Sequence, residues 1–161
     1  MIGKLEQLVD DSANRHSKLV LLIGQLHSGR TTLLTELSKR RASLVLNVGA
    51  DLGRKLLAEP SKRRQLLAAN FLNDLTEEKE NPCLLLDNIE LLFDRTLQLD
   101  PLSLLKQQAY ARQVVAVWPG ELRGNRLSYA VKGHPEHQEY AADGFIYFVV
   151  HRSRKCSGDA L

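Results

Sequence analysis

The fold of this chain is decided by the stretch Leu19-Val20-Leu21-Leu22-Ile23-Gly24-Gln25-Leu26-His27-Ser28-Gly29-Arg30-Thr31. An apolar run with the length of a buried strand leads into a loop with glycines at 24 and 29, and a helical pattern follows. Residues 24–31 match the phosphate-binding P-loop pattern G-x-x-x-x-G-K-[ST] except at its seventh position, where Arg30 replaces lysine. The sequence therefore predicts a strand, a phosphate-binding loop and a helix in that order.

This loop supplies the candidate nucleotide-binding residues. Backbone N–H groups of such a loop converge on phosphate oxygens, and the positive end of the next helix dipole adds to the attraction. The hydroxyl of Thr31 is the expected Mg²⁺ ligand, and Arg30 takes the place of the lysine that contacts the β and γ phosphates. The predicted nucleotide-binding residues are Gly24, Ser28, Gly29, Arg30, Thr31 and Thr32.

Apolar runs and helical patterns alternate along the rest of the chain. The predicted strands cover residues 19–23, 44–48, 83–86, 114–117 and 145–150, and the predicted helices cover 1–14, 31–41, 53–59, 61–80 and 101–111. The strands are continuously apolar, which is typical of parallel strands covered on both faces. We therefore expect an α/β, P-loop NTPase-like three-layer sandwich with a mainly parallel five-stranded sheet, an AAA-like core without a lid domain.

Two regions fall outside this alternation. Residues 118–143 contain five glycines or prolines and predict a loop with one short strand near 127–130. Residues 151–161 are basic, have no apolar pattern and predict a disordered tail. We expect a single P-loop nucleotide-binding domain over residues 1–150, followed by this tail.

Composition limits the classes of function. The 161 residues are 43% hydrophobic and 25% charged with a net charge of +3, as in an ordinary soluble globular protein. No apolar run approaches the roughly 20 residues that span a bilayer, and no signal-peptide core follows the amphipathic start. We expect a cytoplasmic protein without membrane contact. Cys83 and Cys156 lack C-x-x-C spacing, so neither a disulfide nor a metal role is expected for them.

The run Cys83-Leu84-Leu85-Leu86-Asp87-Asn88 predicts the second half of the site. Apolar residues ending in an acid form a Walker B strand, whose carboxylate holds the Mg²⁺ water shell opposite the P-loop threonine. Thr31 and Asp87 are therefore the predicted metal residues, partly through water, and the predicted cofactors are Mg²⁺ and ATP or another NTP. The alternative is a buried strand that ends in a helix-capping aspartate.

The expected catalytic base is replaced. Many P-loop ATPases carry a glutamate directly after the Walker B aspartate, whereas this chain has Asn88, which can orient water but cannot accept its proton at neutral pH. Glu90 is the nearest carboxylate, and Glu121 is a second candidate. Asn88 and Glu90 are the predicted catalytic residues. Together with Arg30, Asn88 favours a nucleotide-binding protein with slow or absent hydrolysis.

Four strings suggest a relationship: residues 84–93 (LLLDNIELLF), 99–102 (LDPL), 118–122 (WPGEL) and 133–136 (GHPE). Over residues 4–150 the chain resembles the BrxF family, the small P-loop component of one type of BREX phage-exclusion system in bacteria. The resemblance implies a cytoplasmic protein that works beside a DNA methyltransferase, a large ATPase and a phosphatase-like protein in defence against phage. Asn88 belongs to a shared string, whereas Arg30 departs from the usual P-loop lysine.

Three functions stay open at this point. The first is a nucleotide-binding, slowly hydrolysing subunit of a defence assembly. The second is an ATPase activated by self-association or by a partner that supplies an arginine finger, with Arg112, Arg123 and Arg126 as candidates near the site. The third is a non-catalytic adaptor that binds DNA or a methyltransferase.

Basic clusters at residues 39–41, 62–64 and 152–155 are the candidate DNA contacts. Cations suit a helix C-terminus, which accounts for the first cluster, whereas the second lies near a helix start and is the better candidate. The histidines at 134 and 137 flank a Pro-Glu pair that favours a solvated loop over a metal site. Trp118 is expected to pack against the segment that follows it.

Overall fold

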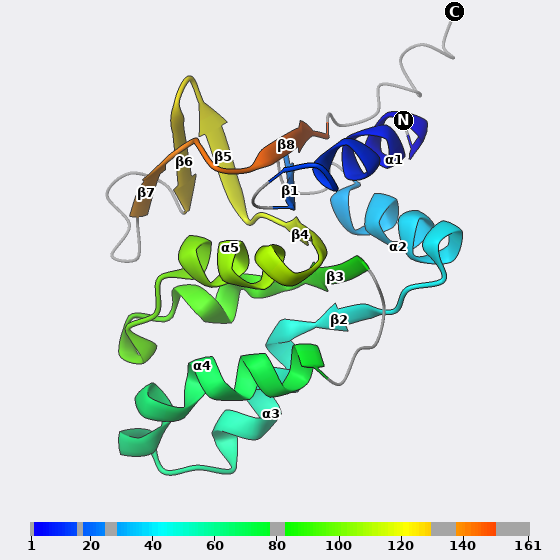
Figure 1. The fold of residues 1–161 in the computed structure, drawn as a ribbon. Helices are drawn as coiled ribbons and strands as arrows, with labels where there is room; N and C mark the ends of the chain where they lie inside the picture. The colour runs from blue at the N-terminus through cyan, green and yellow to red at the C-terminus, as the bar shows by residue number, and fades with distance from the viewer. Residues whose placement is uncertain (1, 16–17, 25–28, 78–82, 130–137, 151–161) are drawn as a thin grey trace, which may run out of the picture.

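The computed structural model describes residues 2–15, 18–24, 29–77, 83–129 and 138–150 (Figure 1). The strands of its main sheet are β1 (Leu19–Ile23), β2 (Val45–Asn47), β3 (Cys83–Asp87), β4 (Gln113–Val117) and β8 (Ile146–Val149). They lie in the order β2-β3-β4-β1-β8, and every neighbouring pair is parallel. The mainly parallel five-stranded sheet predicted from the sequence is confirmed.

Helices cover both faces of this sheet. On one face lie α1 (Ile2–Ser12) and α2 (Arg30–Arg41), and on the other lie α3 (Val48–Leu57), α4 (Ser61–Glu77) and α5 (Pro101–Ala111) (Figure 1). The buried side chains of β1 alternate between the layers: Val20 and Leu22 pack with α1 and α2, whereas Leu19 and Leu21 belong to the core under the other helices. The chain is therefore a three-layer sandwich.

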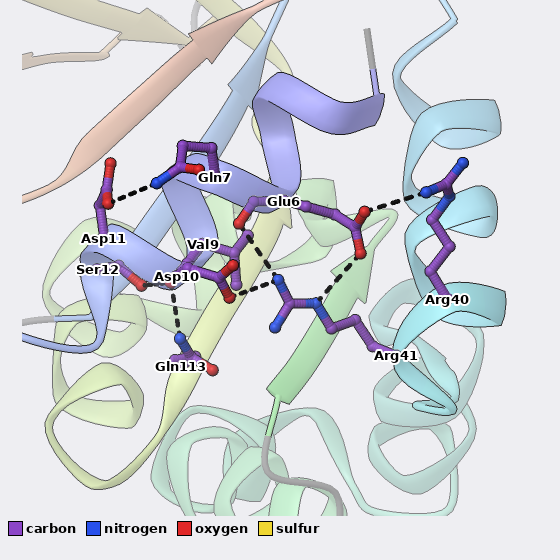
Figure 2. Close-up of polar contacts among 9 residues, drawn as sticks. All are labelled: Glu6, Gln7, Val9, Asp10, Asp11, Ser12, Arg40, Arg41 and Gln113. Atoms are coloured by element: carbon purple, nitrogen blue, oxygen red, sulfur yellow. Dashed lines mark hydrogen bonds and ion pairs between the residues drawn. The ribbon is translucent and has the colours of Figure 1, made fainter.

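Ion pairs hold α1 against the C-terminal end of α2. Figure 2 shows Arg40 and Arg41 reaching from α2 to Glu6 and Asp10 on α1. The Arg41 Nη2 atom lies 2.8 Å from Asp10 Oδ1, and the Arg40 Nη1 atom lies 3.1 Å from Glu6 Oε2. Gln113, the first residue of β4, donates from Nε2 to the carbonyl oxygen of Val9 at 2.6 Å. Two cations of the first basic cluster therefore have a structural role.

The predicted boundary between the second strand and the next helix was wrong. The helix α3 begins at Val48, directly after β2, rather than at residue 53. Asn47 ends the strand because its Oδ1 atom accepts a hydrogen bond from the Ala50 N–H at 3.0 Å and caps the helix. Leu44, which was assigned to the strand, is 66% exposed.

For residues 118–143, the short strand predicted near residues 127–130 is present, whereas the loop predicted around it was wrong because two further strands are formed. Three strands form a separate antiparallel sheet: β5 (Gly120–Arg123), β6 (Arg126–Tyr129) and β7 (Gln138–Ala141). The two-residue turn Gly124-Asn125 joins β5 to β6, and Gly124 has a positive φ of 56°. Glycine adopts such a conformation at low cost, and Gly-Asn is a common two-residue hairpin turn, so this dipeptide was a hairpin signal in the sequence.

Trp118 attaches the small sheet to the main core. Its side chain is fully buried, and its Nε1 atom donates to the Ser128 carbonyl oxygen at 3.0 Å. The indole makes edge-to-face contacts with Phe93 and Tyr140, at ring-centroid distances of 5.2 and 5.6 Å. Tyr129 stacks on Phe93 at 3.9 Å. Each such aromatic pair contributes about 0.5–1.5 kcal/mol beyond its burial. The expectation that Trp118 packs against the segment after it is confirmed.

Several features predicted from the sequence lie outside the described residues. They are residues 25–28 of the loop, including Ser28, the histidine-containing stretch 134–137, and the tail 151–161 with Cys156 and the third basic cluster. Within the described ranges, no helix has the length and apolar character needed to cross a membrane. Cys83 is buried in β3, and this burial raises the pKa of its thiol to about 11, as suits a core residue.

The substitution Gly120→Ala should destabilise the fold. A Cβ atom there would overlap the Ser128 carbonyl oxygen and lie 2.8 Å from Trp118 Nε1, so the indole hydrogen bond would have to break or shift. We expect a loss of about 1–3 kcal/mol in the free energy of unfolding, measured by urea denaturation. Gly3→Ala is the control, because no atom lies within 4 Å of its Cβ position. Equal stability of the two variants would contradict the packing described here.

Candidate functional site

The carboxyl ends of β1, β3 and β4 meet at one edge of the main sheet. Gly24 follows β1, Asp87 ends β3 and Trp118 follows β4. Because all three strands are parallel and β4 lies between the other two, these residues share an edge. The structure therefore places the start of the predicted P-loop and the predicted Walker B aspartate at the same end of the sheet.

The first turn of α2 also lies at this edge. Its N-cap residue is Gly29, whose φ of 96° falls in the left-handed region that glycine adopts readily. A glycine cap offers no side-chain oxygen to the N–H groups of the first turn, and the first turn contains no acidic residue. Thr31 and Thr32 are exposed there. Such a helix start attracts anions through its N–H groups and its dipole.

Arg30 links this helix start to the other strands. Its Nη1 atom donates a hydrogen bond to the backbone carbonyl oxygen of Trp118. Burial lowers the pKa of the Arg30 guanidinium from its usual value, and the negative charges of Glu90 and Asp87 oppose that shift. Through its contact with Trp118, the guanidinium reaches the carboxyl end of β4, the strand that neighbours the one ending in Asp87. The structure thus brings Arg30, Asp87 and Glu90 together.

Asp87 and Asn88 form a tight backbone turn. Asp87 is buried, and its Oδ1 atom accepts a hydrogen bond from the Asn88 N–H at 2.8 Å. Asn88 has a φ of 53° and a ψ of 51°, a left-handed conformation that asparagine tolerates better than most residues. It precedes the 3-10 helix η1 (Ile89–Phe93), on whose first turn Glu90 is exposed. Both predicted catalytic residues therefore lie beside the buried aspartate.

A second helix start, which sequence reasoning missed, adjoins this turn. Asn47 pairs with Asp87 in the register of β2 and β3 and caps α3. Gly49, in the first turn of α3, approaches so closely that a Cβ atom would lie 3.1 Å from the Asn88 carbonyl oxygen. The available signal was an asparagine directly after an apolar run, which is a common helix start.

The three arginine-finger candidates do not share one location. Arg112 precedes β4 at its amino end, opposite the site, and its guanidinium donates to the Thr76 carbonyl oxygen. The prediction that Arg112 lies near the site was therefore wrong. Arg123 and Arg126 flank the β5–β6 turn, where they are exposed and pair with Glu121 at 3.2 Å and Glu139 at 3.3 Å. Glu121, the second candidate base, is thus the exposed partner of Arg123.

The basic cluster at residues 62–64 has a structural component as well. The Arg64 Nε atom donates to the carbonyl oxygens of Leu56 at 2.8 Å and Glu59 at 3.0 Å, which fixes the corner between α3 and α4. Arg63 lies 3.8 Å from a Glu59 carboxylate oxygen. This corner accounts for the placement of Arg64 without a partner molecule.

Comparison with known proteins identifies a fold. No family model and no curated protein matches the chain. A crystal structure of a DNA replication initiation factor matches with a TM-score of 0.51 and 16% identity, over 98% of this chain and 48% of that one. A structure of AMPPCP-bound DnaA from Aquifex aeolicus gives a TM-score of 0.47 and 16% identity, over 96% and 46%.

The chain thus spans about half the length of these solved structures. At 16% identity the likeness concerns the fold. No helical lid domain follows the core within the residues that the structure describes. Sheet order, helix layers and structural similarity agree: the chain has an α/β, P-loop NTPase-like fold.

Proposed function

We propose that this chain is a P-loop subunit that binds a nucleoside triphosphate with Mg²⁺ and hydrolyses it slowly. The observation that carries this proposal is the meeting of the α2 start, Asp87 and Arg30 at one edge of a parallel sheet. Ligands of open α/β sheets bind at the carboxyl ends of the strands. The sequence 24–31 supplies the phosphate-binding pattern at the same edge.

The residues at this edge suit both the phosphates of the nucleotide and its Mg²⁺ ion. The N–H groups of the α2 start, the exposed hydroxyls of Thr31 and Thr32, and the Arg30 guanidinium suit phosphate oxygens. The Asp87 carboxylate and the Thr31 hydroxyl are oxygen ligands, which Mg²⁺ prefers. When bound, Mg²⁺ would neutralise charge on the phosphates. Gly24, Gly29 and Ser28 complete the predicted loop.

The same residues argue for slow hydrolysis. Asn88 occupies the place after Asp87 and can position a water molecule but cannot take its proton. Glu90 is the carboxylate that could do so, and it lies near Arg30. Arginine has a longer side chain with a planar guanidinium, whereas lysine carries a compact ammonium group. We expect this difference to disturb the contact with a phosphoryl group during its transfer more than the contact with a bound phosphate.

We further propose that the chain works in a BREX-type phage-defence assembly with a DNA methyltransferase, a large ATPase and a phosphatase-like protein. The resemblance to BrxF supports this proposal. Two of the strings that carry the resemblance lie at the site: residues 87–93 form the Asp87 turn and η1, and residues 118–122 begin at Trp118, which contacts Phe93. Co-purification of these partners with a tagged chain from phage-challenged cells would test the proposal, and recovery of none of them would contradict it.

A partner-activated ATPase is the second candidate. The exposed Arg123 and Arg126 on the β5–β6 hairpin favour it, because an arginine supplied by a neighbouring subunit must be accessible. A turnover number that rises with protein concentration would identify this mechanism, whereas a constant one supports the leading proposal.

Nucleotide binding should depend on Arg30. Isothermal calorimetry of the wild type with ATP or a non-hydrolysable analogue and Mg²⁺ should show binding. Arg30→Ala should weaken it by about 1.5–3 kcal/mol, because a charge-assisted contact to phosphate is lost. Arg63→Ala is the matched control, since this exposed arginine pairs with Glu59 at the corner between α3 and α4, which cover the opposite face of the sheet from α2. Absence of heat with every nucleoside triphosphate would refute the site.

Hydrolysis should be slow and should respond to Asn88. We expect wild-type turnover well below the enzyme median of about 10 s⁻¹. Asn88→Glu should raise it, and Arg30→Lys should raise it further. Glutamate in this left-handed conformation costs about 1 kcal/mol, so folding of the variant is checked by circular dichroism. Fast wild-type turnover that Glu90→Gln abolishes would show instead that Glu90 is an efficient base.

A further inference from the structure

We propose that the hydrogen bond from Arg30 to the Trp118 carbonyl oxygen is a latch that is closed without nucleotide and opened by bound phosphates. In this model Trp118 transmits the occupancy of the site to the β5–β7 sheet. The inference rests on the proposed nucleotide binding and assigns a regulation to that site. The contact itself is present in the described structure.

The latch joins two segments that nucleotide binding would affect differently. Arg30 is the first residue of α2, directly after the predicted phosphate loop. Trp118 directly follows β4, and its N–H donates to the Leu22 carbonyl oxygen of β1 at 2.9 Å. The backbone of Trp118 is therefore hydrogen-bonded to the main sheet through its N–H group and to Arg30 through its carbonyl oxygen.

Phosphate should displace the carbonyl from Arg30. A guanidinium and a phosphate carry opposite charges and frequently pair through two parallel N–H···O bonds, whereas a carbonyl oxygen is a neutral acceptor. A phosphate oxygen near the α2 start is thus a better acceptor for the guanidinium than the neutral Trp118 carbonyl. Withdrawal of Arg30 would leave Asp87 and Glu90 without its charge, and Mg²⁺ bound with the nucleotide would replace that charge.

The contacts of Trp118 connect a movement of its carbonyl group to the β5–β7 sheet. The indole Nε1 atom holds the Ser128 carbonyl oxygen of β6, and Gly120 at the start of β5 leaves no room for even a Cβ atom. Tyr140 of β7 contacts the same ring. A displacement of the Trp118 carbonyl therefore moves the peptide that leads into β5 and alters the contacts of all three strands.

The experiment uses two signals from the full chain. Trp118 is the single tryptophan, so intrinsic fluorescence reports it alone. Hydrogen exchange of residues 120–129 reports β5 and β6. Addition of AMPPCP and Mg²⁺ to the wild type should change the emission and speed this exchange about fivefold, the effect of losing one net hydrogen bond.

Variants at Arg30 separate the latch from phosphate binding. Arg30→Lys keeps the charge of an ordinary P-loop but has a shorter side chain without the guanidinium fork. It should bind AMPPCP, yet its emission and exchange without nucleotide should already equal those of the loaded wild type and should not change on loading. Arg30→Ala should show the same unlatched signals with weaker binding. Arg63→Ala should behave as the wild type in both measurements.

Each contrary result has a distinct meaning. Calorimetric binding to the wild type without any change in emission or exchange would overturn the latch and leave the proposed function standing. Wild-type signals from nucleotide-free Arg30→Lys and Arg30→Ala would also overturn it. Absence of AMPPCP binding to the wild type would refute the proposed function and, with it, opening of the latch by nucleotide.

Discussion

The arrangement depends on the insertion of β4 between β1 and β3 in a parallel register. Residues 114–117 are buried and pair with β1 on one side, and residues 113–116 pair with β3 on the other. This pairing sets the lateral separation of Gly24 and Asp87 and brings Trp118 between them at the sheet edge. A slip of one residue would turn every β4 side chain to the opposite layer, so the two cores that cover the sheet also fix the geometry of the site.

Trp118 has two structural roles at this edge of the sheet. Its side chain anchors the β5–β7 sheet through one hydrogen bond and a group of aromatic contacts, while its backbone lies in the candidate site. A polar side chain at this position could form a hydrogen bond with a nucleotide directly. The apolar indole cannot accept a hydrogen bond, so the backbone carbonyl oxygen is the acceptor that the residue offers to Arg30.

The sequence was sufficient for the strands and layers, because the buried strands of a parallel sheet are continuous apolar runs that differ plainly from their surroundings. The position of Asp87 could also be predicted from the sequence, since an aspartate at the end of an apolar strand lies at the carboxyl end of the sheet. Of the small sheet, only the strand β6 was expected; β5 and β7 were missed because each has four residues that alternate between half-buried and exposed positions. The stability of this sheet comes from the aromatic contacts with Phe93 and Trp118, which sequence spacing does not reveal.

The ion pairs between α1 and α2 affect how the protein responds to the salt concentration around it. The helix α2 is tied by Arg40 and Arg41 to Glu6 and Asp10 at one end and carries Arg30 at the other. These bridges are partly solvent-accessible, so dissolved ions screen them over a Debye length that shrinks from about 10 Å at 0.1 M to about 3 Å at 1 M salt. Concentrated electrolyte would therefore loosen the N-terminal helix and free one end of the helix that presents Arg30.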